Sequence, residues 1–182
     1  MRIIGGAARG RLLKTPSGQD IRPTSDKVRL AIFNALFSRG GVVDKVIFDA
    51  FCGTGALGCE ALSQGAAKVV FCDVSKISLN LAKENATALN FLDRSEFILK
   101  DATKIDHRPP AIKPIQIAFL DPPYRKGLIS PTLDALYAGD WLSEDALLIL
   151  ETDAKEDHIS NHGQIVFDKT YGDTRVTFLQ KK

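Results

Sequence analysis

Apolar residues along this 182-residue chain fall into short runs that alternate with stretches of helical periodicity. From residue 45 onward the runs have strand length and contain almost no polar residues. Such strands, separated by helices, are typical of a parallel sheet that is covered on both faces. The predicted strands span residues 46–48, 68–72, 97–99, 115–120 and 147–150.

The C-terminal part follows a different pattern. Residues 164–167 and 175–179 are two further apolar runs, and only a turn at Tyr171-Gly172-Asp173 separates them. This spacing predicts an antiparallel hairpin at one end of the sheet. The predicted fold class is therefore α/β, with a mostly parallel seven-stranded sheet and a C-terminal antiparallel hairpin.

The first 40 residues form a basic extension in this interpretation, and residues 41–182 form the main domain. Short strands and turns are expected over residues 1–22, and then a helix that begins at Thr24 or Ser25. Residues 1–30 carry seven basic and two acidic side chains, a net charge of +5, against +2 for the whole chain. This imbalance predicts a polyanionic partner such as a nucleic acid, although a solvated tail is the simpler alternative. The arginines expected to contact phosphates are Arg2, Arg9, Arg11, Arg22 and Arg29.

Composition narrows the class of protein further. Hydrophobic residues make up 45% and charged residues 25%, and no apolar stretch approaches the roughly 20 residues that span a membrane. The N-terminus lacks the apolar core of a secretion signal. The three cysteines, Cys52, Cys59 and Cys72, form no Cys-x-x-Cys pair. We therefore expect a cytoplasmic protein with reduced thiols and no metal site.

A glycine-rich loop follows the first predicted strand. Gly53, Gly55 and Gly58 satisfy the G-x-G-x-x-G pattern at a strand-to-helix turn. Asp73 ends the next strand, where a carboxylate can accept hydrogen bonds from two ribose hydroxyls. By itself this pattern fits NAD as well as a nucleoside with another tail.

Acidic residues distinguish between these cofactors. Asp49 lies at the mouth of the loop, where it would repel a pyrophosphate but attract the cationic groups of S-adenosylmethionine. Asp101 follows the third strand and could accept a hydrogen bond from the adenine amine. Three acidic strand ends favour S-adenosylmethionine, although each carboxylate could instead only cap the next helix.

The sequence Asp121-Pro122-Pro123-Tyr124 follows the fourth predicted strand. Two successive prolines end a strand and force a turn, so a carboxylate, stiff carbonyls and an aromatic ring come together at the strand's C-terminal end. This combination can hold a flat group that bears an NH2, because the oxygens accept its two N–H groups and the ring stacks on its face. A tight turn capped by Asp121 is the alternative.

These motifs resemble those of a known class. Residues 49–58 resemble the cofactor loop of class I S-adenosylmethionine-dependent methyltransferases, and residues 121–124 match the motif of those that methylate exocyclic or amide nitrogens. The N-terminal Arg2-Ile3-Ile4-Gly5-Gly6 and Arg9-Gly10-Arg11, with Arg22-Pro23-Thr24, resemble the RsmD family, the bacterial 16S rRNA (guanine-N2)-methyltransferases. Cys52, Thr54 and Gln64 depart from residues common in that family.

The resemblance implies a Rossmann-like methyltransferase sheet and transfer of a methyl group to the 2-amino group of a guanine in 16S rRNA. It also implies a monomer acting on the small ribosomal subunit or an assembly intermediate of it. Phe51 and Ala102 join the expected cofactor-binding residues, and Asp121, Pro122, Pro123 and Tyr124 are the expected catalytic ones.

Three other functions stay open. A DNA adenine-N6 methyltransferase can carry the same Asp-Pro-Pro-Tyr motif, but we expect it to need an added region that reads sequence. A non-catalytic RNA-binding protein that keeps S-adenosylmethionine as a structural ligand would be expected to have a degraded motif. A nicotinamide-dependent oxidoreductase would bind NAD in preference to S-adenosylmethionine.

Overall fold

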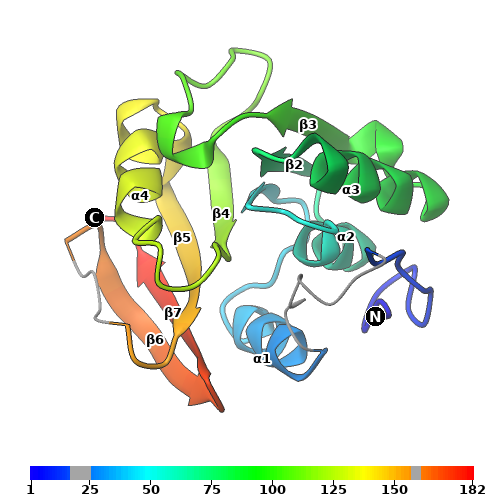
Figure 1. Ribbon diagram of the computed structural model, residues 1–182, viewed down its shortest axis with the longest axis horizontal. Coiled ribbons are helices and arrows are strands. Elements are labelled where there is room, and N and C mark those ends of the chain that lie inside the picture. Colours follow the sequence, from blue (N-terminus) through cyan, green and yellow to red (C-terminus); the bar gives the residue numbers. More distant parts are fainter. Residues whose placement is uncertain (17–25, 157–160) are drawn as a thin grey trace.

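A single sheet of seven strands forms the centre of the computed structural model, which describes residues 1–16, 26–156 and 161–182 (Figure 1). The strand order is β3-β2-β1-β4-β5-β7-β6. The strands are β1 (Val46–Ala50), β2 (Lys68–Asp73), β3 (Ser95–Leu99), β4 (Ile115–Leu120), β5 (Leu142–Asp153), β6 (Gln164–Tyr171) and β7 (Thr174–Gln180). Neighbours from β3 to β5 pair in parallel, whereas β7 runs antiparallel to both β5 and β6. The predicted fold class is confirmed.

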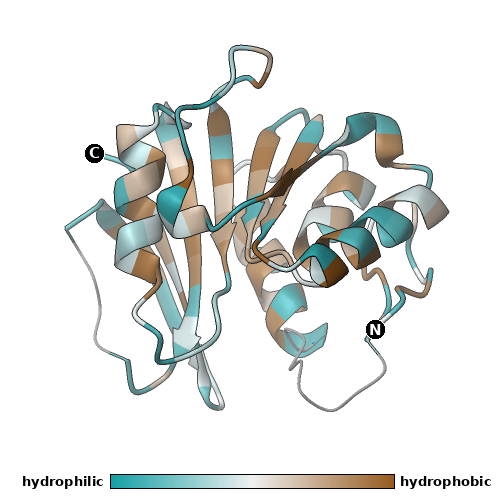
Figure 2. Ribbon diagram, turned by 45° about the horizontal axis from the view of Figure 1, so that its top comes forward, coloured by the Kyte–Doolittle hydropathy of each residue, from teal (hydrophilic) through white to brown (hydrophobic). Residues whose placement is uncertain are grey.

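Helices cover both faces of the sheet. They are α1 (Asp26–Phe37), α2 (Ala56–Ser63), α3 (Lys76–Ala88) and α4 (Ile129–Ala138), with short 3₁₀ turns at Leu92–Arg94 and Ala102–Lys104. One core joins α1, α2, α3 and residues 1–13 to alternate positions of the strands, and a second core joins α4 to the opposite positions. The apolar strands run between the two layers in Figure 2. None of the helices in the described part of the chain is long and apolar enough to cross a membrane.

Helix α4 is not among the elements predicted from the sequence. Its buried residues Ile129, Leu133 and Leu136 nevertheless follow helical spacing. Pro131 lies in the first turn, where its missing N–H group breaks no hydrogen bond of the helix.

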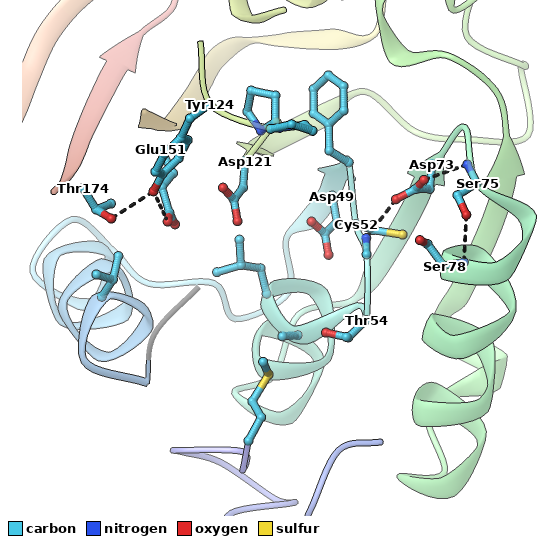
Figure 3. Close-up of a pocket in the computed structure, with 18 of the residues that line it drawn as sticks. Asp49, Cys52, Thr54, Asp73, Ser75, Ser78, Asp121, Tyr124, Glu151 and Thr174 are labelled. Carbon is cyan, nitrogen blue, oxygen red and sulfur yellow. Dashed lines mark hydrogen bonds between the residues drawn. The ribbon is translucent and has the colours of Figure 1, made fainter. Parts of the chain in front are cut away.

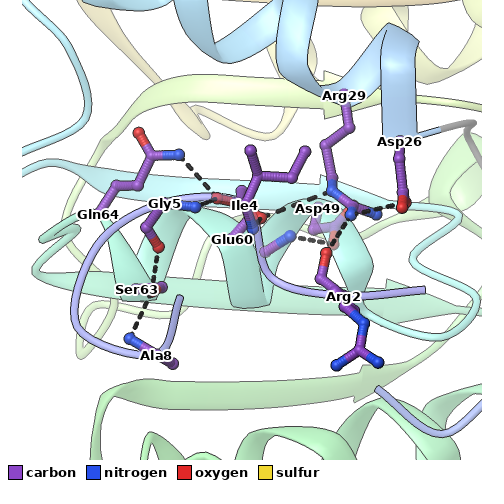
Figure 4. Close-up of polar contacts among 11 residues, drawn as sticks. Arg2, Ile4, Gly5, Ala8, Asp26, Arg29, Asp49, Glu60, Ser63 and Gln64 are labelled. Carbon is purple, nitrogen blue, oxygen red and sulfur yellow. Dashed lines mark hydrogen bonds and ion pairs between the residues drawn. The ribbon is translucent and has the colours of Figure 1, made fainter. Parts of the chain in front are cut away.

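The N-terminal segment folds back on itself and packs on α2. No strand forms within residues 1–16, where short strands were expected, and Arg2 makes only an isolated antiparallel bridge with Leu12. The Glu60 carboxylate in α2 accepts hydrogen bonds from the backbone N–H groups of Ile4 and Gly5, both at 2.8 Å (Figure 4). Residues 1–16 are thus attached to the main fold by buried polar contacts. The predicted helix caps Thr24 and Ser25 lie outside the described residues.

The order of the strands determines where a ligand can bind. The chain moves outward from β1 to β2 and β3, and then crosses back to β4 and β5 on the other side of β1. The connections that leave the carboxyl ends of β1 and β4 therefore run in opposite directions along the sheet, and open parallel sheets bind their ligands in the crevice at such a point.

Candidate active site

A cavity of about 550 Å³ opens at the carboxyl ends of β1 and β4 (Figure 3). The glycine-rich loop, the end of β2 and the turn after β4 line it, and we call it the site cavity. It contains most of the residues that the sequence assigned to cofactor and catalysis. These are Asp49, Phe51, Gly53, Asp73, Asp121, Pro122, Pro123 and Tyr124.

The glycine-rich loop turns sharply because several of its residues have positive φ. Gly53 and Gly55 have φ values of 54° and 74°, which cost little only for glycine, and Phe51 has a φ of 57°. Gly55 and Gly58 are not among the described residues that line the cavity. A Cβ atom on Gly58 would lie 2.3 Å from the Phe71 ring, so this glycine allows α2 to approach β2 closely. A role for Gly55 and Gly58 in cofactor binding stays a prediction.

Asp49 lies inside β1 at the floor of the site cavity and is 2% exposed. Its carboxylate accepts a hydrogen bond of 2.9 Å from the backbone N–H of Gly58. Burial raises the pKa of Asp49 well above its usual range, the Gly58 bond lowers it, and the charges of Asp121 and Asp73 raise it again. With Glu151, four carboxylates line this cavity, and a cationic ligand would stabilise all of them.

Asp73 connects the glycine-rich loop to the start of α3. One carboxylate oxygen accepts from Gly53 N at 2.9 Å, and the other accepts from Ser75 N at 2.8 Å. Because a carboxylate oxygen can accept a second hydrogen bond, Asp73 can still bind hydroxyl groups of a ligand in the cavity. Its two bonds explain how the loop keeps its shape, and a role for Asp73 in binding the ribose of a nucleoside stays a prediction.

Asp101 and Ala102 are not among the described residues that line the site cavity. Asp101 caps the short helix after β3, where it accepts hydrogen bonds from the backbone and side chain of Thr103. The Thr103 bonds lower the pKa of Asp101. Ala102 is buried in the core beneath α4. Their assignment to the cofactor site stays a prediction.

The turn after β4 presents Asp121 and Tyr124 to the cavity (Figure 3). The Tyr124 hydroxyl lies 3.0 Å from Glu151 Oε1 and 2.9 Å from Thr174 Oγ1. Burial and the nearby carboxylates raise the pKa of Tyr124, so the phenol stays protonated. The double-proline turn thus brings a carboxylate and an aromatic ring to the same cavity as the glycine-rich loop.

Several cavity residues were absent from the sequence-based site. Glu151 ends the apolar part of β5, Thr174 begins β7 and Tyr171 ends β6. A usable signal existed for Glu151, because it directly follows a predicted apolar run, residues 147–150, just as Asp49, Asp73 and Asp121 follow theirs. Thr174 and Tyr171 carry no such signal, since they reach the cavity through the pairing of the hairpin with β5.

The predicted RNA-binding arginines have different surroundings. Arg9 is exposed. Arg2 donates to the carbonyl of Gly10 at 3.1 Å, and Arg11 donates to the carbonyl of Ala88 at 2.7 Å, with both side chains on exposed residues. Arg22 lies outside the described residues.

Arg29 differs from that prediction because its side chain is fully buried. Its Nε lies 3.5 Å from Glu60 Oε2, and Glu60 is fully buried as well (Figure 4). Arg29 also donates to Asp26 and to the backbone carbonyl of Arg2. It therefore joins α1 to α2 and the N-terminal segment, and it is not available to a phosphate at the surface.

Comparison with known proteins identifies close relatives. Ribosomal RNA small subunit methyltransferase D from Escherichia coli (strain K12) is 36% identical over 156 residues, which cover 85% of this chain and 76% of that protein. The protein of the same name from Haemophilus influenzae is 31% identical, and the match covers 94% of this chain and 89% of the relative. A family model described as Conserved hypothetical protein 95 matches residues 1–180.

Solved structures agree with the observed topology. The YhhF protein from Escherichia coli superposes with a TM-score of 0.84 at 30% identity, covering 100% of this chain and 98% of that one. An RNA methyltransferase from Salinibacter ruber, solved in complex with S-adenosyl-L-homocysteine, has a TM-score of 0.67 at 17% identity and shares the fold.

The sheet order and the cavity between β1 and β4 define the class of protein as a Rossmann-like methyltransferase. Within this class the chain belongs to the RsmD family, whose model, described as Conserved hypothetical protein 95, spans residues 1–180. The family resemblance predicted from the sequence is therefore confirmed.

Proposed function

We propose that this protein is an S-adenosylmethionine-dependent rRNA methyltransferase that modifies the 2-amino group of a guanine in 16S rRNA. One observation carries the proposal: Asp121-Pro122-Pro123-Tyr124 lines the same cavity as the glycine-rich loop and Asp73. The relatives named Ribosomal RNA small subunit methyltransferase D support an rRNA substrate.

S-adenosylmethionine is the cofactor, and when bound it supplies an electrophilic methyl group on a sulfonium sulfur. Asp73 would hold its ribose hydroxyls, while Asp49 and Asp121 would attract its ammonium and sulfonium charges. Phe51 and Gly53 would contact it from the glycine-rich loop. The lining of the cavity supports this assignment, because a cavity with several carboxylates favours a cation over the pyrophosphate of NAD.

The chemistry that we assign to the turn is the activation of an amine. The 2-amino lone pair of guanine is delocalised into the ring and is a poor nucleophile. Asp121 and a carbonyl of the proline turn would accept the two N–H groups, which turns the lone pair toward the methyl group. Tyr124 would stack on a base that is splayed out of its surroundings. The new N–C bond would form as the S–C bond breaks, and Asp121, which accepts one N–H group, would take the proton that the methylated nitrogen loses. Holding the nitrogen in line with the methyl group would supply much of the acceleration.

The basic N-terminal residues would bind the RNA backbone. In this proposal residues 1–40 are the RNA-binding extension, with Arg2, Arg9 and Arg11 toward phosphates. The enzyme would act as a monomer on the small ribosomal subunit or its assembly intermediate. This division assigns recognition to the extension and chemistry to the main domain.

The proposed activity can be tested by nucleoside mass spectrometry of rRNA from cells with and without the gene. We expect the loss of one N2-methylguanosine from 16S rRNA and no change in 23S rRNA, which serves as the internal control. An unchanged 16S profile would contradict the proposal. A loss of N6-methyladenosine would keep the amine chemistry but assign it to adenine.

A further inference from the structure

Tyr124 is held at its hydroxyl end by two strands that lie beyond the turn itself. Glu151 on β5 accepts a hydrogen bond from the phenol, with 3.0 Å between the Tyr124 hydroxyl oxygen and Glu151 Oε1. A phenol has only one proton, so Thr174 on β7 must donate in its 2.9 Å contact with the Tyr124 oxygen. Figure 3 shows the three side chains together at the edge of the site cavity.

Both partners of the hydroxyl are fixed in the fold. Glu151 is 4% exposed and Thr174 is 5% exposed, and the two strands that carry them pair directly. The Tyr124 ring lines the site cavity and is only partly buried. One end of this side chain is thus restrained by rigid strands, while the aromatic face is available to a ligand.

Such a restraint has a consequence for catalysis. Methyl transfer requires the target nitrogen to approach the methyl carbon within a narrow range of distance and angle, and small misplacements cost rate. A stacking ring that can rotate leaves the base several orientations, and only some of them are reactive. Two hydrogen bonds on the phenol limit that rotation before the base arrives.

We propose that Glu151, together with Thr174, is a positioning residue that fixes the Tyr124 ring against the target base. The inference rests on the proposed function, because it requires a base to stack on Tyr124. Glu151 does not act on the base itself. A purely architectural role, in which Glu151 only completes the buried polar contacts of β5 and β7, is the competing explanation.

Single-turnover methylation of small-subunit particles separates the two explanations. Glu151→Gln keeps an oxygen that accepts from the phenol, and it should keep nearly the wild-type rate. Glu151→Ala and Thr174→Val should each slow the step by about 5- to 30-fold, the range expected for one lost hydrogen bond. Thr152→Val, at the next position of β5, is the matched control and should be unaffected. S-adenosylmethionine affinity, measured by calorimetry, should be no lower in Glu151→Ala than in Glu151→Gln, which loses the same charge, and it should be unchanged in Thr174→Val and Thr152→Val.

A double-mutant cycle provides the sharper criterion. If Glu151 acts through the Tyr124 hydroxyl, Glu151→Ala should cause no further loss of rate in a Tyr124→Phe background. Multiplicative losses would overturn the proposal, as would a cofactor affinity that falls in step with the rate. If Glu151→Ala does not fold, the rate of Thr174→Val tests the proposal in its place. A wild-type rate in Thr174→Val would also overturn the proposal. An inactive wild-type protein would instead count against the proposed function.

Discussion

Gly58 in α2 offers a test of how the glycine-rich loop is packed. A Cβ atom at this position would lie 2.3 Å from Phe71 Cε1, 2.7 Å from Phe71 Cζ and 2.9 Å from Asp49 Oδ2. Carbon atoms in contact are normally about 3.5–4.0 Å apart, so Gly58→Ala requires the Phe71 ring to move by more than about 1 Å. That ring is fully buried and stacked on Phe97, with centroids 5.2 Å apart, so it has little room to retreat.

Two effects of this substitution oppose each other. Alanine is the better helix former by about 1 kcal/mol, which would stabilise α2. Overpacking in a close-packed core costs about 1–3 kcal/mol, and here it also displaces the N–H group that binds Asp49. We expect overpacking to win by about 1–2 kcal/mol, which corresponds to a drop in Tm of about 2–8 °C for a domain of this size.

Thermal unfolding of the ligand-free protein measures this loss directly. The control is the same substitution in a Phe71→Leu background, where the ring is gone and Gly58→Ala should cost much less. Cofactor affinity should also fall, because Asp49 lines the cavity. A Gly58→Ala protein as stable as wild type, or an equal cost in both backgrounds, would refute the packing argument.

Three other predictions concern charge and stacking. Burial and the neighbouring carboxylates raise the pKa of Asp49, so the folded state keeps this proton to higher pH than the unfolded chain and loses stability as pH rises toward the raised pKa. Asp49→Asn should remove that loss, so above the raised pKa the variant should be more stable than wild type in pH-dependent unfolding. The same substitution should weaken S-adenosylmethionine binding by about 1–3 kcal/mol in calorimetry. A fall in stability without a loss of affinity would contradict this. Replacing Arg9 and Arg11 with alanine should lower RNA affinity and reduce its salt slope by about one to two counterions, whereas an unchanged slope would remove both from the interface. Tyr124→Ala should reduce single-turnover methylation by about 1–3 kcal/mol through lost stacking, with Tyr124→Phe less affected, and equal rates for all three proteins would argue against a base on this ring.

The alternation of apolar runs and helices was sufficient to predict the sheet, since each buried parallel strand is marked by its own residues. Asp49, Asp73 and Asp121 were found for the same reason: each stands at or near the carboxyl end of such a strand, and parallel strands bring those ends together. Local sequence carries this information without reference to distant contacts.

Other features depend on contacts between distant residues. The bond between Tyr124 and Glu151 joins β4's turn to β5 across 27 residues, and no local pattern encodes it. The burial of Arg29 had a weak signal, because it precedes Ile32 by three residues and shares the buried face of α1. Its partner Glu60 lies on α2, however, and the local sequence of α1 does not reveal this partner. The charge of Arg29 by itself therefore predicted an exposed side chain.

The central claim is that Asp121 acts on an exocyclic amine, and single-turnover methylation of 16S rRNA in small-subunit particles by Asp121→Ala tests it most directly. Asp121→Asn is the matched control, because its side-chain carbonyl still accepts a hydrogen bond. With product nucleosides identified by mass, we expect Asp121→Ala to lose about 2–4 kcal/mol of transition-state stabilisation, about 30- to 1000-fold in rate, and Asp121→Asn to lose less. An Asp121→Ala protein that folds, binds cofactor and RNA, and forms N2-methylguanosine at the wild-type rate would contradict the account.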